Sequence, residues 1–300
     1  MNINKVCIIG GTGFVGHHLI PKLANAGIEC RIPARRPHRY RSLEVQKGCE
    51  LAPLGKLDAE SLKSHFSGCD AVINLLGILN ESNSRSFEEM HVEIPKIILE
   101  AALQSGVKRL LHMSALNADE TNGASNYLKS KGKAENLMHT LNAGSVKVTS
   151  FRPSVIFGDN DSFINRFAQL LMIPGPLPLA CAGAKFSPVY VGDVTAAFLK
   201  ALTDESTFGK SYELCGPRTL TLLQIVEYIA QHKGVHKNII ALGDAMSRLQ
   251  AKILGIMPGK PFTIDNYNSL QLPSVCTHNG LQQLGIKATD MDAIVPHMLR

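Results

Sequence analysis

The 300-residue sequence contains no tryptophan, and aromatic residues make up only 6% of it. It also has no uninterrupted apolar run close to the roughly eighteen residues that a membrane-spanning helix requires. Residues 1–11 run directly into a strand-like segment, without the charged leader and cleavage site of a secreted precursor. With 45% hydrophobic and 19% charged residues, these absences indicate a soluble, unprocessed globular protein.

Cysteine motifs are absent as well. None of the seven cysteines belongs to a C-x-x-C pair or has the spacing of metal ligands, so no metal site is expected. Several lie in apolar stretches, which favours small buried side chains in a reducing cytoplasm over a disulfide framework. The cysteines are Cys7, Cys30, Cys49, Cys69, Cys181, Cys215 and Cys276.

The sequence also lacks a basic block with interleaved aromatic residues, although its formal net charge is +6. Because nucleic-acid-binding modules concentrate their charge, nucleic acid is not expected as a partner. The excess of positive charge leaves two other ligands open, namely a phosphorylated small molecule and an acidic membrane surface.

What the sequence does contain is a regular alternation of strand and helix patterns. Residues 5–9 form a short apolar run that ends in two glycines, and Val15, Leu19 and Leu23 recur next at helical spacing. Such repeated units predict an α/β fold with a doubly wound, parallel Rossmann sheet. Further strands are predicted at 29–32, 71–76, 109–113 and 146–151, and further helices at 97–104 and 127–141.

The second half is less regular and predicts a smaller lobe. Short strands at 189–191 and 212–214 are expected to return to the sheet, and helix-like segments follow at 222–232 and 245–257. A lobe beyond the carboxyl ends of the strands would cover a ligand there. The expected domains are a Rossmann domain of residues 1–160 and 186–216, and a discontinuous C-terminal lobe for substrate or partner of residues 161–185 and 217–300.

The segment 245–257 is amphipathic. Its apolar residues recur at helical spacing on one face, with two cations beside them. A core helix of the small lobe is the favoured interpretation, and a helix that lies on a membrane or a partner is the alternative. The apolar residues are Met246, Leu249, Ile253 and Ile256, and the cations are Arg248 and Lys252.

A glycine-rich turn joins the first predicted strand to the first helix. Glycines permit a tight turn and the close approach of a phosphate to the backbone, and the helix N-terminus offers unpaired N–H groups to an anion. Because strand, turn and helix occur in the order of a dinucleotide-binding unit, we expect this turn to bind the pyrophosphate of NAD(P). The expected cofactor-binding residues are Gly10, Thr12, Gly13, Phe14, Val15 and Gly16.

After the second predicted strand, where an acidic residue would bind the ribose hydroxyls of NAD, the sequence reads Pro33-Ala-Arg-Arg36. Two guanidinium groups there can bind a 2′-phosphate through charge-assisted hydrogen bonds. Arg35 and Arg36 therefore favour NADP(H) as the cofactor, with NAD(H) as the alternative. Without a phosphate to bind, they would be a solvated surface pair.

Tyr127 and Lys131 lie one helical turn apart in the predicted helix 127–141, so both side chains can point at one ligand. An ammonium close to a tyrosine favours its phenolate, which would make Tyr127 a general acid and base. Lys131 is also expected to bond the ribose of the nicotinamide. Ser114, at the end of the strand 109–113, is expected to orient the substrate oxygen, so Tyr127, Lys131 and Ser114 are the predicted catalytic residues.

These motifs, over nearly the whole chain, resemble those of the extended short-chain dehydrogenase/reductases. They are Gly10-Gly-Thr-Gly-Phe-Val-Gly16, Ser114, Tyr127-x-x-x-Lys131, Arg152-Pro-Ser-Val-Ile-Phe-Gly158 and Pro188-Val-Tyr-Val-Gly-Asp193. Three further motifs resemble an atypical subgroup that contains the nucleotide-binding accessory subunit of respiratory complex I and relatives of nucleoside-diphosphate-sugar epimerases. They are His91-Val-Glu-Ile-Pro95, His112-Met-Ser-Ala-Leu116 and Pro261-Phe-Thr263.

The resemblance implies a strand order of 3-2-1-4-5-6-7 and a C-terminal lobe over the nicotinamide. Two departures from the family pattern stand out. His91 occupies the place of a usual asparagine, and the usual acidic residue after the third strand is replaced around Lys56 and Leu57, so Leu57 would pack on the adenine. Further residues implied to line the cofactor are Leu57, Leu75, Leu76, Gly77, Ile78 and Pro153.

Two functions follow from the resemblance. The first is an NADP(H)-dependent oxidoreductase or nucleotide-sugar epimerase-like enzyme that acts on an unidentified small molecule. The second is a non-catalytic accessory or assembly subunit of complex I, in which bound dinucleotide stabilises the fold and the partner belongs to the respiratory chain or the membrane periphery. His17 and His18 are interpreted as packing or surface residues, and His112 as a hydrogen-bonded core residue, rather than as metal ligands.

Overall fold

The computed structural model describes residues 1–300 except 83, 142–143 and 300. The strands of its main sheet are β1 (Lys5–Ile9), β2 (Glu29–Ala34), β3 (Cys49–Pro53), β4 (Ala71–Asn74), β5 (Arg109–Met113), β6 (Lys147–Pro153) and β11 (Lys210–Leu214). They are all parallel and lie in the order β11-β6-β5-β4-β1-β2-β3. The predicted doubly wound Rossmann sheet is confirmed, and β11 takes the seventh place in the expected strand order.

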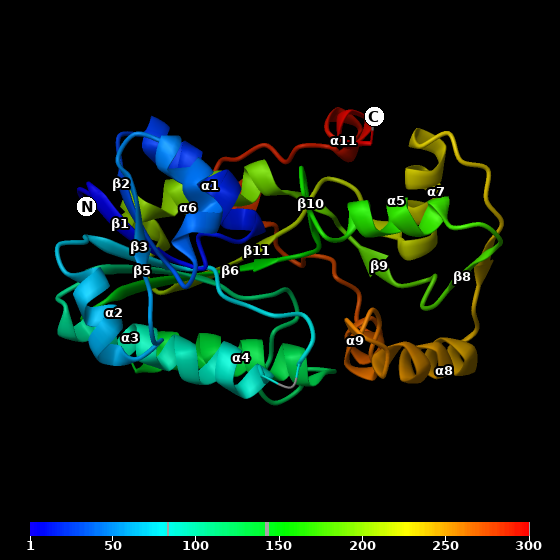
Figure 1. The fold of residues 1–300 in the computed structure, drawn as a ribbon, viewed down its shortest axis with the longest axis horizontal. Helices are drawn as coiled ribbons and strands as arrows, with labels where there is room; N and C mark the ends of the chain where they lie inside the picture. Colours follow the sequence, from blue (N-terminus) through cyan, green and yellow to red (C-terminus); the bar gives the residue numbers. More distant parts are fainter. Residues whose placement is uncertain (83, 142–143, 300) are drawn as a thin grey trace.

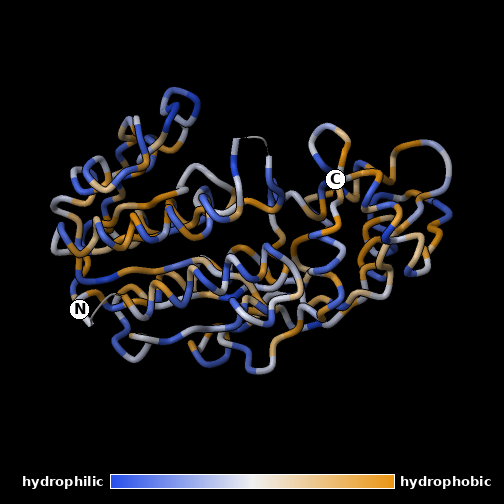
Figure 2. The backbone as a smooth tube through the Cα atoms, turned by 90° about the horizontal axis from the view of Figure 1, so that it is seen from below, coloured by the Kyte–Doolittle hydropathy of each residue, from blue (hydrophilic) through white to orange (hydrophobic). Residues whose placement is uncertain are grey.

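Helices cover both faces of this sheet. They are α1 (Phe14–Asn25), α2 (Ala59–Phe66), α3 (Ile94–Gln104), α4 (Asn126–Thr140) and α6 (Val191–Thr203). Helices α1 and α6 lie on one face, and α2, α3 and α4 lie on the other (Figure 1). Because both faces are covered, every residue of β4 and β5 is buried. Hydrophobic and hydrophilic stretches alternate along the helices (Figure 2), as expected where one helix face packs on a core.

A separate hydrophobic cluster lies beyond one end of the sheet, on the right in Figure 1. The helices of this region are α5 (Ile164–Met172), α7 (Leu222–His232), α8 (Asp244–Gly255), α9 (Ile264–Ser269) and α11 (Val295–Met298), whereas α10 (Gly280–Gln283) packs against β11 of the main sheet. Its short strands are β7 (Ile156–Phe157), β8 (Leu177–Leu179), β9 (Lys185–Phe186), β10 (Val189–Tyr190), β12 (Leu220–Thr221) and β13 (Ile239–Ala241). Short turns of helix are η1 (Pro37–Val45), η2 (Glu88–Glu93), η3 (Glu205–Thr207) and η4 (Met291–Ala293). The exact domain boundaries stay a prediction.

One predicted strand is wrong. Residues 189–191 do not return to the main sheet, because β10 pairs with β7 in a separate two-stranded sheet and α6 already begins at residue 191. The prediction for 212–214 is confirmed by β11.

The interpretation of 245–257 as a core helix is also wrong. The segment is helical as α8, but Met246, Leu249, Ile253 and Ile256 are exposed. The buried residues of α8 are Ser247 and Ala251, because the helix packs through these small side chains. Of the helices in the described part of the chain, none combines the length and the apolarity needed to cross a membrane.

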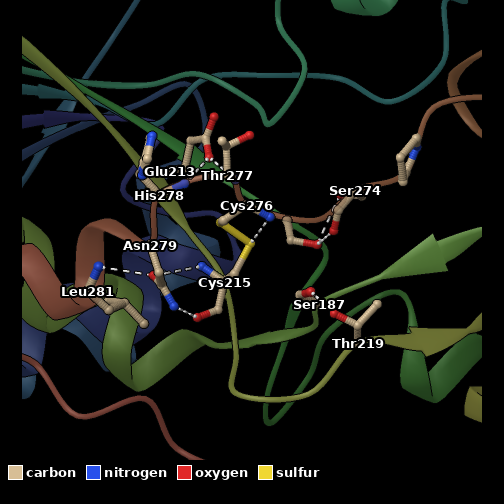
Figure 3. Close-up of a disulfide and its surroundings, with 12 residues drawn as sticks. Ser187, Glu213, Cys215, Thr219, Ser274, Cys276, Thr277, His278, Asn279 and Leu281 are labelled. Carbon is tan, nitrogen blue, oxygen red and sulfur yellow. Dashed lines mark hydrogen bonds between the residues drawn. A yellow bond between two sulfur atoms is a disulfide. The ribbon is translucent and has the colours of Figure 1, made fainter.

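Cys215 and Cys276 form a disulfide (Figure 3), so the expectation that the cysteines remain unpaired is wrong for these two. They meet because the segment before α10 runs beside the end of β11. The Thr277 amide donates a hydrogen bond to the Glu213 carboxylate, and the Asn279 side-chain amide donates one to the Cys215 carbonyl. The remaining five cysteines are free.

Candidate functional site

The turn between β1 and α1 has the shape of a phosphate cradle. Gly10 has a φ of +80°, and a Cβ there would lie 3.0 Å from the backbone at 75–76. At Gly16 a Cβ would lie 2.1 Å from the Gly11 carbonyl oxygen. Helix α1 begins after Gly13 without a side-chain cap and without an acidic residue in its first turn, so its first N–H groups are available to an anion. The turn therefore fits the diphosphate of a dinucleotide.

Thr12, Phe14 and Val15 belong to the same turn and the start of α1. The Phe14 ring packs edge-on against His18, with 5.3 Å between the ring centroids. His17 Nδ1 lies 2.8 Å from the Gly13 carbonyl oxygen, and His18 Nε2 lies 3.0 Å from the Asp159 carbonyl oxygen. Both histidines are thus hydrogen-bonded to the backbone. Within the described residues, no group of three or more His, Cys, Asp and Glu side chains could hold a metal ion.

Arg35 and Arg36 directly follow β2 and are exposed. Neither forms an ion pair with any residue that the structure describes. The next segment, η1, adds further cations, and its Tyr40 ring contacts His17 with 6.2 Å between centroids. That contact places the basic segment beside the start of α1, on the side where β2 ends.

The carboxyl end of β4 is held by a buried histidine. His91, in η2, accepts a hydrogen bond at Nε2 from the Ile78 amide at 3.0 Å, and its Nδ1 lies 2.9 Å from Ser130 Oγ. Because Ser130 donates its hydroxyl proton to the Tyr127 carbonyl, His91 must donate from Nδ1 to Ser130. Burial, and then the charge of Lys131, lower the pKa of His91 to about 3, so this residue is a neutral positioning group.

Lys131 lies next to this histidine. Its Nζ donates a hydrogen bond of 2.5 Å to the Met113 carbonyl oxygen at the end of β5. A Cβ added at Gly77 would be 3.9 Å from Lys131 Nζ and 3.7 Å from His91 Nε2. Burial lowers the pKa of Lys131 to about 8, against an opposing effect of Glu135. The structure thus brings the end of β4, the end of β5 and the middle of α4 together.

Tyr127 stands at the first turn of α4, and its ring packs edge-on against Phe87 and His91. Burial, and then the charge of Asp265, raise the pKa of Tyr127 to about 12. The expected stabilisation of its phenolate by Lys131 is not found in this arrangement, because the ammonium is held by Met113. In the part of the chain that the structure describes, the Tyr127 hydroxyl has no hydrogen-bond partner, so it is available to a ligand.

Ser114 follows β5 and is buried. Its hydroxyl lies toward Glu135 on α4, without the geometry of a hydrogen bond. Glu135 accepts hydrogen bonds from Arg152 and Ser211. Burial alone would raise the pKa of Glu135, but the polar contacts of its neighbours, with those of Arg152 the strongest, together outweigh it, and the pKa is lowered. An orienting role for Ser114 stays a prediction.

Helix α9 is a part of the site that the sequence did not reveal. The Asp265 carboxylate accepts hydrogen bonds from the backbone amides of Asn126 at 2.7 Å and of Tyr127 at 3.1 Å, and so caps α4. Residues 270–271, just after α9, line a cavity of about 600 Å³ together with residues 181–185 and the start of α8. The first turn of α9 contacts α4 at Tyr127, and the end of α9 reaches this cavity. Helix α9 therefore connects Tyr127 with the cavity.

The other residues implied to line the cofactor lie around the ends of the strands. Leu75, Leu76 and Ile78 follow β4, and Leu57 follows β3. Pro153 ends β6, where its carbonyl accepts a hydrogen bond from the Leu116 amide. Their contacts with a cofactor remain predictions.

His112 differs from the interpretation as a hydrogen-bonded core residue. Its Nδ1 accepts a hydrogen bond of 3.1 Å from the Asn74 side-chain amide, but the buried Nε2 has no partner among the described residues. Burial holds the pKa of His112 well below its usual range, so the ring is neutral. The interpretation is therefore correct for one of its two ring nitrogens only.

Comparisons with known proteins agree with this geometry. Residues 6–215 match the profile of the NAD dependent epimerase/dehydratase family. The protein named NADH dehydrogenase (ubiquinone) 1 alpha subcomplex subunit 9, mitochondrial, of Mus musculus is 29% identical over 98% of this chain and 79% of its own length. A ceramide reductase of Caulobacter vibrioides is 28% identical over 64% of this chain and 58% of its own length.

Solved structures show the same fold. The UDP-glucose 4-epimerase of Thermotoga maritima, determined with UDP-glucose, superposes with a TM-score of 0.77 at 15% sequence identity, over 98% of this chain and 97% of that one. At this identity the likeness concerns the fold.

Proposed function

Because this chain belongs to the NAD dependent epimerase/dehydratase family, in which a nicotinamide dinucleotide is the expected ligand, we propose that it is an NADP(H)-dependent reductase of a carbonyl group. The resemblance to the atypical extended short-chain dehydrogenase/reductases is confirmed. The observation that carries the proposal is Tyr127, a neutral phenol without a partner among the described residues, one helical turn before Lys131. The similarity to a relative named as a reductase supports it.

The protonation of the site favours reduction over oxidation. NADPH, when bound, supplies a hydride to the carbonyl carbon. Tyr127 donates its hydroxyl proton to the carbonyl oxygen, and a pKa of about 12 keeps that proton in place at neutral pH. Lys131, with a pKa of about 8, still carries its charge at pH 7, and its hydrogen bond to the Met113 carbonyl holds the ammonium at the end of β5. His91 holds the backbone at Ile78 in position.

The cofactor residues of the proposal follow from the cradle. The amides at the start of α1 bind the diphosphate, and the glycines at 10 and 16 let the turn pack closely against the backbone at 75–76 and at Gly11. Arg35 and Arg36 bind the 2′-phosphate, which would select NADP(H). Their exposure at the end of β2 and their lack of an ion-pair partner in the described chain support this assignment.

Calorimetric titration with NADPH and NADH tests the cofactor. In the double variant Arg35→Ala/Arg36→Ala, the Kd for NADPH should rise roughly tenfold or more, since charge-assisted hydrogen bonds are lost, while the Kd for NADH should stay the same. Unchanged NADPH affinity would refute the role of the two arginines.

A panel of carbonyl compounds and nucleotide sugars tests the reaction. Tyr127→Phe should bind NADPH normally and lose turnover by at least about a hundredfold, because the proton donor is gone. Tyr228→Phe is the control, since it removes a hydroxyl that is bonded to Asp292 in the small lobe. Equal turnover by Tyr127→Phe and the native enzyme would exclude the proposed chemistry.

A second function is favoured by the complex I relative, which matches 98% of the chain. In this alternative the protein is a non-catalytic accessory or assembly subunit of the respiratory complex, bound at the cytoplasmic membrane, and the dinucleotide stabilises it. Co-purification with respiratory-chain subunits, together with a thermal shift by NADPH and no turnover on any substrate of the panel, would favour the accessory role.

A further inference from the structure

Helix α8 exposes an apolar face that nothing in the described chain covers. The side chains of this face are between 46% and 86% exposed. At 100° per residue they fall within an arc of about 100°, roughly opposite the packed residues Ser247 and Ala251. Figure 1 shows α8 at an outer corner of the molecule, with α9 beside it. The apolar residues of this docking face are Met246, Leu249, Ile253, Ile256 and Met257.

The charge around the docking face has one sign. From 245 to 264 the sequence contains Arg248, Lys252 and Lys260 but no Asp or Glu. Arg248 and Lys252 are exposed and lie on one flank of the apolar arc, and neither forms an ion pair within the part of the chain that is described. The carboxylate at the start of the helix, Asp244, is bonded to the Tyr267 hydroxyl.

We propose that α8 docks the protein on an anionic phospholipid surface, with its apolar face among the acyl chains and its cations at the headgroups. A helix with apolar side chains on one exposed arc and cations at the edge of that arc matches the apolar interior and the charged headgroups of such a surface. Exposed apolar side chains that are gathered in this way are rare on monomeric proteins unless they bind something. The absence of Asp and Glu from residues 245–264 selects an anionic bilayer over a neutral one.

Docking would set the orientation of the candidate site. The Asn80 side chain donates a hydrogen bond to the Lys260 carbonyl, and Asp265 caps α4 at Tyr127. The neighbouring Leu79 is 60% exposed and can add to the apolar contact. Hydrogen bonds therefore connect the segment that follows the docking face with the end of β4 and with the start of α4, on both sides of the candidate site. The inference does not depend on the proposed reductase activity.

Flotation of the full-length protein with vesicles tests the proposal. We expect binding to vesicles of phosphatidylcholine with phosphatidylglycerol, and weak binding to phosphatidylcholine alone. Arg248→Gln/Lys252→Gln should weaken binding about fivefold per charge at low salt. Raising the salt concentration should weaken the binding of the native protein to about the level of this variant. Ile253→Ser/Ile256→Ser should weaken it roughly tenfold or more.

The matched control is Met172→Ser/Ile173→Ser, which removes two other exposed apolar side chains, at the end of α5. This control should bind vesicles like the native protein. All variants should keep the native melting temperature and the native far-ultraviolet circular dichroism spectrum. Equal binding to both kinds of vesicle, or native binding by both α8 variants, would overturn the proposal. A second outcome would also overturn it: the native protein fails to float but forms a concentration-dependent dimer, and Ile253→Ser/Ile256→Ser abolishes that dimer. The occupant of the docking face would then be a second copy of this chain.

Discussion

Replacing Cys276 by serine removes the covalent link between the end of β11 and the segment that leads to α10. The disulfide joins residues 61 positions apart. For a loop of this length, the chain-entropy relation gives about 4 kcal/mol of free energy of unfolding, because the unfolded chain loses freedom when it is cross-linked. The amides of Thr277 and His278 still donate to Glu213 without the link, so the native geometry persists and the loss arises in the unfolded state. We expect a loss of about 2 to 4 kcal/mol, or up to about 6 °C in Tm.

Thermal melting with and without reductant measures this effect. Reductant should lower the Tm of the native protein to that of Cys276→Ser and leave the variant unchanged. Cys181→Ser is the control, since Cys181 is free, and it should respond to reductant like the native protein. Thiol titration of the denatured protein should find five thiols before reduction and seven after it. Finding seven thiols without reductant would refute the reasoning. So would an unchanged Tm after a reduction that releases two further thiols.

Two further predictions concern the candidate site. Gly16→Ala should abolish NADPH binding in calorimetry and lower the free energy of unfolding by about 2 kcal/mol or more, because the new Cβ would lie 2.1 Å from the Gly11 carbonyl oxygen. For Lys131, whose pKa is lowered to about 8 in the folded state, the unfolded chain binds more protons between about pH 8 and 10.5. The free energy of unfolding should therefore gain about 3 kcal/mol across this window, as measured by urea titrations, and Lys131→Met should lack that rise.

The sequence predicted the centre of the fold better than its edges. Buried parallel strands such as β4 and β5 are short apolar runs, and runs of this kind can be recognised because both of their faces are covered. The edge strand β3 was not predicted, because Cys49–Pro53 has only two buried residues and includes a glutamate and a proline. β10 has a strand pattern, but local pattern does not specify a pairing partner, and its partner is β7.

Periodicity identified α8 as a helix but assigned the wrong face to the core. An apolar stripe predicts which face of a helix is buried only if no other face of that helix can pack against the protein. In α8 the small side chains of Ser247 and Ala251 let the backbone approach its neighbours, and Ser247 Oγ accepts a hydrogen bond from the Cys181 amide. This packing leaves the larger apolar side chains in solvent.

In the candidate site, too, some properties follow from residues close in sequence and others from residues far apart. The spacing of Tyr127 and Lys131 fixes their shared helix face, and the sequence shows it directly. Their protonation instead depends on groups far along the chain, since Asp265 lies 138 residues after Tyr127 and adds to the effect of burial on its pKa. The ammonium of Lys131 is likewise held by a carbonyl at the end of another strand. Motif spacing therefore identifies which side chains share a helix face, whereas their protonation depends on contacts that only the folded chain makes.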